Sequence, residues 1–112
     1  FGKPIGHHQG IGFLLADMRI QIEAARALLY KVTAMADAGE TAQLPEMASV
    51  AKAFCSDTAM KVTTDAVQVF GGAGYLVETG IERLMRDAKV TQIYEGTSQI
   101  QRIIISRAMM AD

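Results

Sequence analysis

Two long series of apolar residues recur every three or four positions and constrain the fold more than any other feature of this sequence. That spacing places side chains on one face of an α-helix, so each series predicts a long helix with a buried stripe. The first stripe comprises Ile11, Leu14, Leu15, Met18, Ile22, Ala25, Leu29, Val32 and Ala36. The second comprises Ala48, Ala51, Cys55, Ala59, Val62, Ala66, Val69 and Phe70. Its small residues allow neighbouring helices to approach closely.

Turn residues separate these two helices from each other and from two shorter ones. Gly39 is a stop signal for the first helix, and Pro45 suits the first position of the second. A third helix is predicted to bury Ile81, Leu84, Met85 and Ala88, and a fourth to bury Ile100, Ile103, Ile104 and Ala108. The sequence shows no useful alternation with a period of two. We therefore expect an all-α fold, an antiparallel four-helix bundle.

The overall charge argues against several classes of partner. Eleven basic and twelve acidic residues give a net charge of −1, which does not favour binding to nucleic acids or anionic membranes. No segment is long and apolar enough to span a bilayer. The single cysteine, Cys55, cannot form an internal disulfide, and its apolar setting predicts a buried thiol. His7 and His8 have no spaced third ligand, so we expect no metal site.

A carboxylate stands just before the last predicted helix, in the segment Ile93-Tyr94-Glu95-Gly96-Thr97-Ser98-Gln99-Ile100-Gln101-Arg102. Ser98 followed by Gln101 has the form of a capping box, which satisfies free N–H groups at a helix start. Glu95 is therefore expected just outside a helix N-terminus. By position alone, two interpretations remain open: Glu95 complements the helix dipole, or it is aimed at a bound molecule.

The segment Gly71-Gly72-Ala73-Gly74 matches neither common phosphate loop. A dinucleotide fingerprint that included Gly72 and Gly74 would need a glycine at position 77, where the chain has Val77, and no Gly-Lys-Ser or Gly-Lys-Thr follows. A helix stop requires one glycine. Three glycines in four residues indicate that a ligand approaches the backbone closely.

Together these motifs resemble the acyl-CoA dehydrogenase family. The run Gln68-Val69-Phe70-Gly71-Gly72-Ala73-Gly74-Tyr75, followed by Glu78, Arg83 and Asp87, is similar to its C-terminal signature. Residues 93–102 resemble its catalytic segment, and Phe1-Gly2-Lys3-Pro4 with Gln9 resembles the start of its C-terminal helical domain. The resemblance implies that residues 1–112 are one helical domain of a larger flavoenzyme. We expect the N-terminal helical domain, the central β-domain and an arginine just upstream of Phe1 to lie outside this chain, which alone should be inactive.

What the resemblance implies is α,β-dehydrogenation of an acyl-CoA thioester with FAD as the electron acceptor. The family's general base falls on Glu95, which would remove the α-proton while the β-hydrogen leaves as hydride to the flavin. Such a base is a desolvated carboxylate with a raised pKa. The enolate oxygen is stabilised in the family by the backbone N–H of the base and a ribityl hydroxyl of FAD. Tyr94 and Gly96 are implied to bind the substrate.

The resemblance also implies two groups of cofactor contacts. Phe1, Gln9, Gln68, Val69, Phe70, Gly71 and Gly72 correspond to residues that touch the flavin of a neighbouring subunit. Thr97, Ser98 and Gln99 correspond to residues that touch FAD in the same subunit. A shared flavin implies a homo-oligomer, a dimer or a tetramer. Electron-transfer flavoprotein is the implied acceptor and fatty-acid β-oxidation the implied role, in a bacterial cytoplasm or a mitochondrial matrix.

Two alternatives stay open. The first is a helical oligomerisation module without catalysis, which Glu95 disfavours because packing needs no carboxylate at that position. The second is a domain of an acyl-CoA oxidase-like flavoenzyme, since the two activities differ in how oxygen reaches the reduced flavin. The preferred acyl chain is not specified by these residues.

Overall fold

The computed structural model describes residues 1–111, in which the regular secondary structure is helical and no strand occurs. The four α-helices are α1 (Gln9–Asp37), α2 (Leu44–Phe70), α3 (Ile81–Thr91) and α4 (Ser98–Met109). Three short 3-10 helices, η1 (Ile5–His7), η2 (Gly71–Tyr75) and η3 (Val77–Thr79), complete the described part. The predicted all-α, four-helix fold is confirmed. None of the helices described has the length and apolar character needed to cross a membrane.

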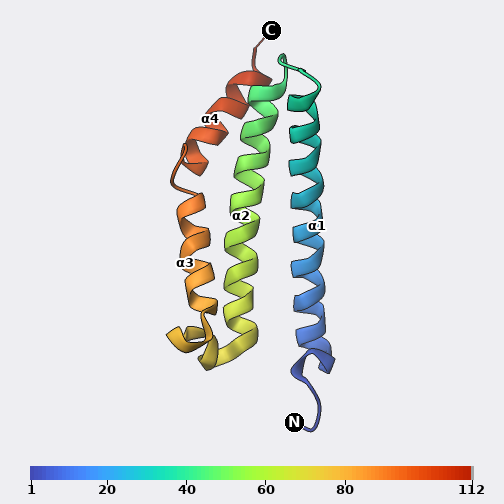
Figure 1. The fold of residues 1–112 in the computed structure, drawn as a ribbon, viewed down its shortest axis with the longest axis vertical. Coiled ribbons are helices and arrows are strands. Elements are labelled where there is room, and N and C mark those ends of the chain that lie inside the picture. The colour runs from blue at the N-terminus through green and yellow to red at the C-terminus, as the bar shows by residue number, and fades with distance from the viewer. Residues whose placement is uncertain (112) are drawn as a thin grey trace.

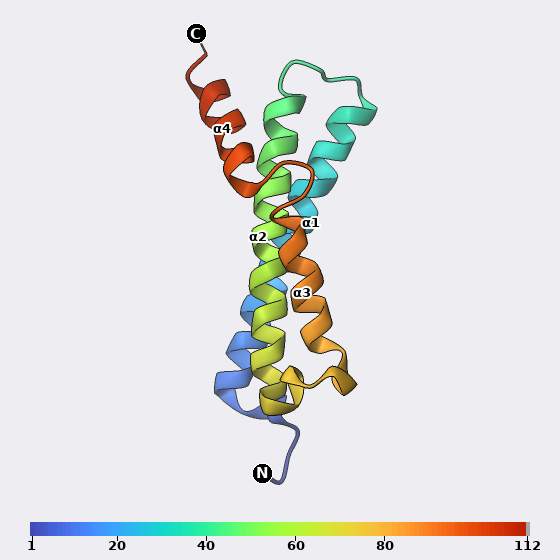
Figure 2. The same ribbon diagram turned by 90° about the vertical axis from the view of Figure 1, so that its left-hand side faces the viewer.

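Helix α2 lies in the middle of the molecule. It packs against α1 on one side and against both α3 and α4 on the other (Figure 1). α1 and α2 run antiparallel, and α3 and α4 follow one another back along α2, so that these two short helices together occupy the place of one long helix. The result is an elongated domain of 60 × 25 × 24 Å. The turn between α3 and α4 therefore lies alongside the middle of α2 (Figure 2).

The helix ends follow the turn chemistry of the sequence, with one shift. Gly39 has a φ of 71° after the end of α1, and Gly71 has a φ of 61° at the end of α2. Glycine adopts these left-handed conformations without the steric cost that a Cβ imposes. Pro45 is the second residue of α2, one position later than predicted. Its missing N–H costs nothing there, because the first four N–H groups of a helix have no intrahelical partner.

The glycines after α2 have different structural reasons. Gly74 is buried where η2 folds back onto α2, and a Cβ there would lie 2.7 Å from both Phe70 Cβ and Val67 O. No side chain fits at that distance. A Cβ at Gly72, by contrast, would have nothing within 4 Å. The positive φ of Gly71 and the tight packing at Gly74 therefore explain two of these glycines, whereas neither constraint applies to Gly72.

The core consists mainly of small side chains. Its buried apolar residues are Ala25, Val32 and Met35 from α1, Ala51 and Ala53 from α2, and Ala88 from α3. Small residues let α2 lie close to its neighbours. Only some residues of the predicted apolar stripes are buried where the helices pack. Leu15, Leu29, Phe70 and Leu84 were predicted to be buried and are 41–55% exposed. Cys55 is half-buried; its Sγ lies 3.5 Å from the carbonyl oxygen of Ala25, and burial raises the pKa of the thiol.

The predicted buried face of α4 is wrong. Ile100, Ile103 and Ile104 are 39–47% exposed. The helix instead turns Ser98 and Gln101 inward, and both are buried. The polar contacts that Gln101 makes with the preceding turn fix this rotation of the helix, and apolar spacing alone could not reveal them.

We expect Gly74→Ala to destabilise the full-length protein by about 1–3 kcal/mol, because the new methyl group overlaps the last turn of α2. Thermal denaturation followed by circular dichroism measures the effect. Gly72→Ala is the matched control, and with both variants measured as flavin-free protein it should melt close to the parent. Equal melting temperatures for the two variants would contradict the packing role of Gly74.

Candidate functional site

The segment predicted to carry the catalytic carboxylate forms the turn between α3 and α4. Glu95 has a φ of 53° and is the one non-glycine residue of the described chain with a positive φ. Gly96 follows with a φ of 91°. A non-glycine residue in this conformation costs roughly 1–3 kcal/mol and persists only where its surroundings enforce it. Strain of this kind is found mainly at functional sites.

The predicted capping box is displaced by one residue. Thr97 is the N-cap of α4, and its Oγ1 accepts a hydrogen bond from the backbone N–H of Ile100 at 3.2 Å. Gln101 reaches further back than a capping box requires. Its Nε2 donates to the carbonyl oxygens of Gly96 at 3.2 Å and of Glu95 at 3.4 Å. The positive φ values bring these two carbonyls within reach of α4, so that Gln101 restrains the Glu95–Gly96 turn directly.

A lysine on α2 that was not predicted from the sequence also contacts and restrains this turn. The Nζ of Lys52 donates to the carbonyl oxygen of Thr91 at 2.8 Å and to that of Gly96 at 2.7 Å. Hydrogen bonds to charged groups contribute about 1.5–3 kcal/mol each, which is comparable to the strain at Glu95. The sequence did contain a signal. Lys52 lies three residues before Cys55, next to a predicted buried stripe, where a lysine is unusual.

Glu95 and Tyr94 line one pocket of about 460 Å³. Lys52 and Thr91 form part of its wall, together with the small side chains Cys55, Ser56 and Ala59 of α2. Both Tyr94 and Glu95 remain exposed in this chain. Gly96 lies against Gln101, whose Nε2 would be 2.6 Å from any Cβ at that position. The φ of Gly96 therefore favours glycine, and a side chain there would also have to displace the Gln101 amide.

Thr97, Ser98 and Gln99 line a different pocket, of about 300 Å³. The side chain of Ser98 is buried there and lies close to Asp57, whose pKa it helps to lower. The free N–H groups and the dipole at a helix start favour negatively charged groups. These features fit the polar groups of a nucleotide-containing cofactor such as FAD.

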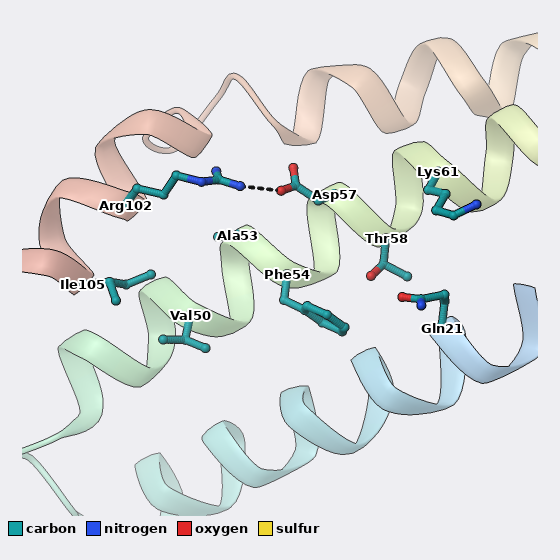
Figure 3. Close-up of a pocket in the computed structure, with 9 residues that line it drawn as sticks. All are labelled: Gln21, Val50, Ala53, Phe54, Asp57, Thr58, Lys61, Arg102 and Ile105. Carbon is teal, nitrogen blue, oxygen red and sulfur yellow. Dashed lines mark hydrogen bonds and ion pairs between the residues drawn. The ribbon is translucent and has the colours of Figure 1, made fainter. Parts of the chain in front are cut away.

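Asp57 connects α2 to both sides of this second pocket. Its Oδ1 accepts from Gln92 at 2.6 Å, and its Oδ2 accepts from Arg102 at 2.8 Å, the pair visible in Figure 3. Arg102 also donates to the carbonyl oxygen of Ser98 at 2.9 Å. Partial burial would raise the pKa of Asp57, but the hydrogen bonds from Arg102 and Gln92 outweigh it and hold that pKa below its ordinary value. Asp57 and Gln92 were not predicted from the sequence, since their contact joins residues 35 positions apart.

The other predicted cofactor contacts gather at the end of the molecule where α1 begins and α2 ends (Figure 2). Phe1 and Val69 line one pocket of about 370 Å³ with Ile5, His8 and Ile11. Phe1 meets the ring of His8 edge-on, with the centroids 6.0 Å apart. The remaining members of this group are Gln9 at the start of α1 and Gln68, Phe70, Gly71 and Gly72 at the end of α2. The structure thus keeps this group apart from Thr97, Ser98 and Gln99.

The ion pair between Asp57 and Arg102 predicts a pH-dependent stability. Because the folded-state pKa of Asp57 is lowered, its stabilising effect is present above the ordinary value of 3.8 and is lost as the pH falls through the folded value. Arg102→Met should therefore lower the melting temperature at pH 6, and the difference from the parent protein should narrow in acid. Arg26→Met, which breaks only the exposed pair with Glu23 on α1, is the control. A difference for Arg102→Met that does not change with pH would contradict this role.

The similarity of this chain to known proteins extends over the whole of the site. The family model for the C-terminal domain of acyl-CoA dehydrogenases matches residues 1–110. The probable acyl-CoA dehydrogenase FadE25 of Mycobacterium tuberculosis is 54% identical over 110 residues, which are 98% of this chain and 28% of that protein.

Two solved structures have the same fold. Butyryl-CoA dehydrogenase from Megasphaera elsdenii superposes with a TM-score of 0.93 at 50% identity, over 99% of this chain and 28% of the other. A chain in a structure described as the electron transferring flavoprotein of Acidaminococcus fermentans gives a TM-score of 0.94 at 52% identity, over 100% and 29%. This chain thus spans less than a third of each protein it resembles. By sequence and by fold, it belongs to the acyl-CoA dehydrogenase family and is similar to the C-terminal helical domain of its members.

Proposed function

We propose that this chain supplies the general base of an FAD-dependent acyl-CoA dehydrogenase and that the base is Glu95. The observation that carries the proposal is the strained conformation of Glu95 beside a pocket, held by Lys52 and Gln101, in a member of this family. A general base must be fixed within reach of the proton it removes. A module that served only for oligomerisation would have no use for a strained carboxylate.

The proposed reaction breaks the α C–H bond of an acyl-CoA thioester and transfers that proton to the Glu95 carboxylate. Bound FAD would supply the acceptor for the β-hydrogen, which leaves with its electron pair. The backbone N–H of Glu95 makes no backbone hydrogen bond among the described residues, whereas those of Tyr94 and Ser98 do. It is therefore free to donate to the thioester oxygen, where negative charge develops. Tyr94 would line the acyl pocket beside it.

Water must be excluded for this chemistry, and Glu95 is exposed in this chain. The missing cover would come from the acyl-CoA, the cofactor and the remainder of a protein that is more than three times longer in the relatives. Activity is accordingly proposed for the whole protein rather than for this domain alone.

The separation of the two groups of cofactor contacts supports a flavin shared between subunits. Thr97, Ser98 and Gln99 would face FAD of the same subunit, in the pocket that they line at the start of α4. Phe1, Gln9 and residues 68–72 would face the FAD of a neighbouring subunit in a homo-oligomer. Gly72 supports this assignment, because a Cβ at that position would contact no other atom of the chain and packing therefore does not require a glycine there. The similarity to a chain in an electron transferring flavoprotein structure supports such a protein as the acceptor.

In the full-length protein, Glu95→Gln should slow flavin reduction by acyl-CoA by about 10²–10⁴-fold, because the amide cannot accept the α-proton. Rapid-mixing absorbance of the bound flavin measures the rate, and the flavin content should stay close to that of the parent. Glu40→Gln, in the turn between α1 and α2, is the matched control. Near-normal turnover of Glu95→Gln would refute the role of the carboxylate.

Gly72→Val should reduce the FAD retained through purification, since the added side chain fills the space that we assign to the dinucleotide. The melting temperature of the flavin-free protein should change little, because nothing in the chain lies within 4 Å of the new Cβ. Ala42→Val, at the opposite end of α2, adds similar bulk as a control. A full complement of flavin in Gly72→Val would count against this assignment.

A further inference from the structure

We propose that Lys52 is a positioning residue for proton abstraction, and that its ammonium group keeps the Glu95–Gly96 turn in the conformation that presents the carboxylate to the pocket. The inference rests on the proposed function, in which Glu95 is the base. Lys52 itself would not transfer a proton or touch the reacting atoms.

The geometry places the Lys52 ammonium at both ends of the segment that carries the base. Its two acceptors are the carbonyl of Thr91, the last residue of α3, and that of Gly96, which directly follows Glu95. At 2.8 and 2.7 Å both contacts have the short distances typical of charge-assisted hydrogen bonds. The carbonyls at a helix C-terminus also attract positive charge. Lys52 therefore joins the central helix to the start and the end of the catalytic turn.

The charge of Lys52 has no other evident use in the described chain. Each ion pair of residues 1–111 involves other basic residues, namely Arg19, Arg26, Lys61, Arg83 and Arg102. The side chain is part-buried, and burial of an ammonium group is unfavourable unless its hydrogen bonds are made. Both of the hydrogen bonds found for it serve the turn.

Gln101 alone would leave the turn less restrained. Its contacts with the carbonyls of Gly96 and Glu95, at 3.2 and 3.4 Å, are longer than those of Lys52 and come from a neutral amide. They also come from α4, which follows the turn directly in sequence and can move with it. Lys52 is the contact that fixes the position of Glu95 relative to α2, and α2 also forms the opposite wall of the pocket.

The test uses three variants of the full-length holoenzyme. Lys52→Met keeps most of the aliphatic stem and removes the ammonium group, Lys52→Gln retains a shorter donor, and Lys52→Arg retains charge and donors. Lys61→Met is the control, because Lys61 lies on the same helix and pairs only with Asp65. The readouts are the rate of flavin reduction at saturating acyl-CoA, the KM, and the kinetic isotope effect with α-deuterated thioester.

We expect Lys52→Met to lower the reduction rate by about 10–100-fold, the range that a displaced catalytic group produces. KM and flavin content should change less than threefold, the α-deuterium isotope effect should increase, and Lys52→Arg should recover part of the rate. If Lys52→Met does not fold, Lys52→Gln decides by the same readouts. The proposal would be overturned if Lys52→Met had the rate and isotope effect of the parent protein. It would also be overturned if a lower rate came with an equally large rise in KM and loss of flavin. An unimpaired Glu95→Gln variant would instead overturn the proposed function.

Discussion

The carbonyl oxygen of Gly96 accepts hydrogen bonds from Lys52 and from Gln101, and the arrangement of the site depends on this shared acceptor. The two donors come from α2 and α4, while the turn itself begins at the end of α3. This one acceptor therefore links α2 and α4 to the turn that follows α3. A positive φ at Glu95 is unfavourable in isolation, and these contacts are what make it the stable conformation.

A core of small residues makes this meeting possible. Alanines at positions 51, 53 and 88 keep the helices close, so that a lysine side chain from α2 can reach the turn. The same choice limits how much apolar surface the chain buries by itself. Isoleucines on α4 and large apolar residues on α1 remain exposed. Exposed apolar surface of this kind is typical of protein–protein interaction sites.

Some of the site could be predicted from local patterns, and the residues show why the rest could not. Glu95 belongs to the same short motif as the start of α4, so its position just outside that helix N-terminus was predicted correctly. Ser98 was predicted as the N-cap of α4, but Thr97 holds that position. Both residue types cap helices, and only the backbone path distinguishes them. Lys52, Asp57 and Gln92 act through partners 35–44 residues away, and no local pattern reports such distances.

By itself, the sequence determined the helical class, the helix ends and the family. Those depend on apolar spacing, on glycine and proline, and on contiguous motifs, all of which act over a few residues. The tertiary structure alone decided the rotation of α4, the conformation of Glu95 and the contacts that Lys52 and Asp57 make with distant parts of the chain. These depend on which side chains meet around the turn between α3 and α4, and that is set only when α2 packs between its neighbours.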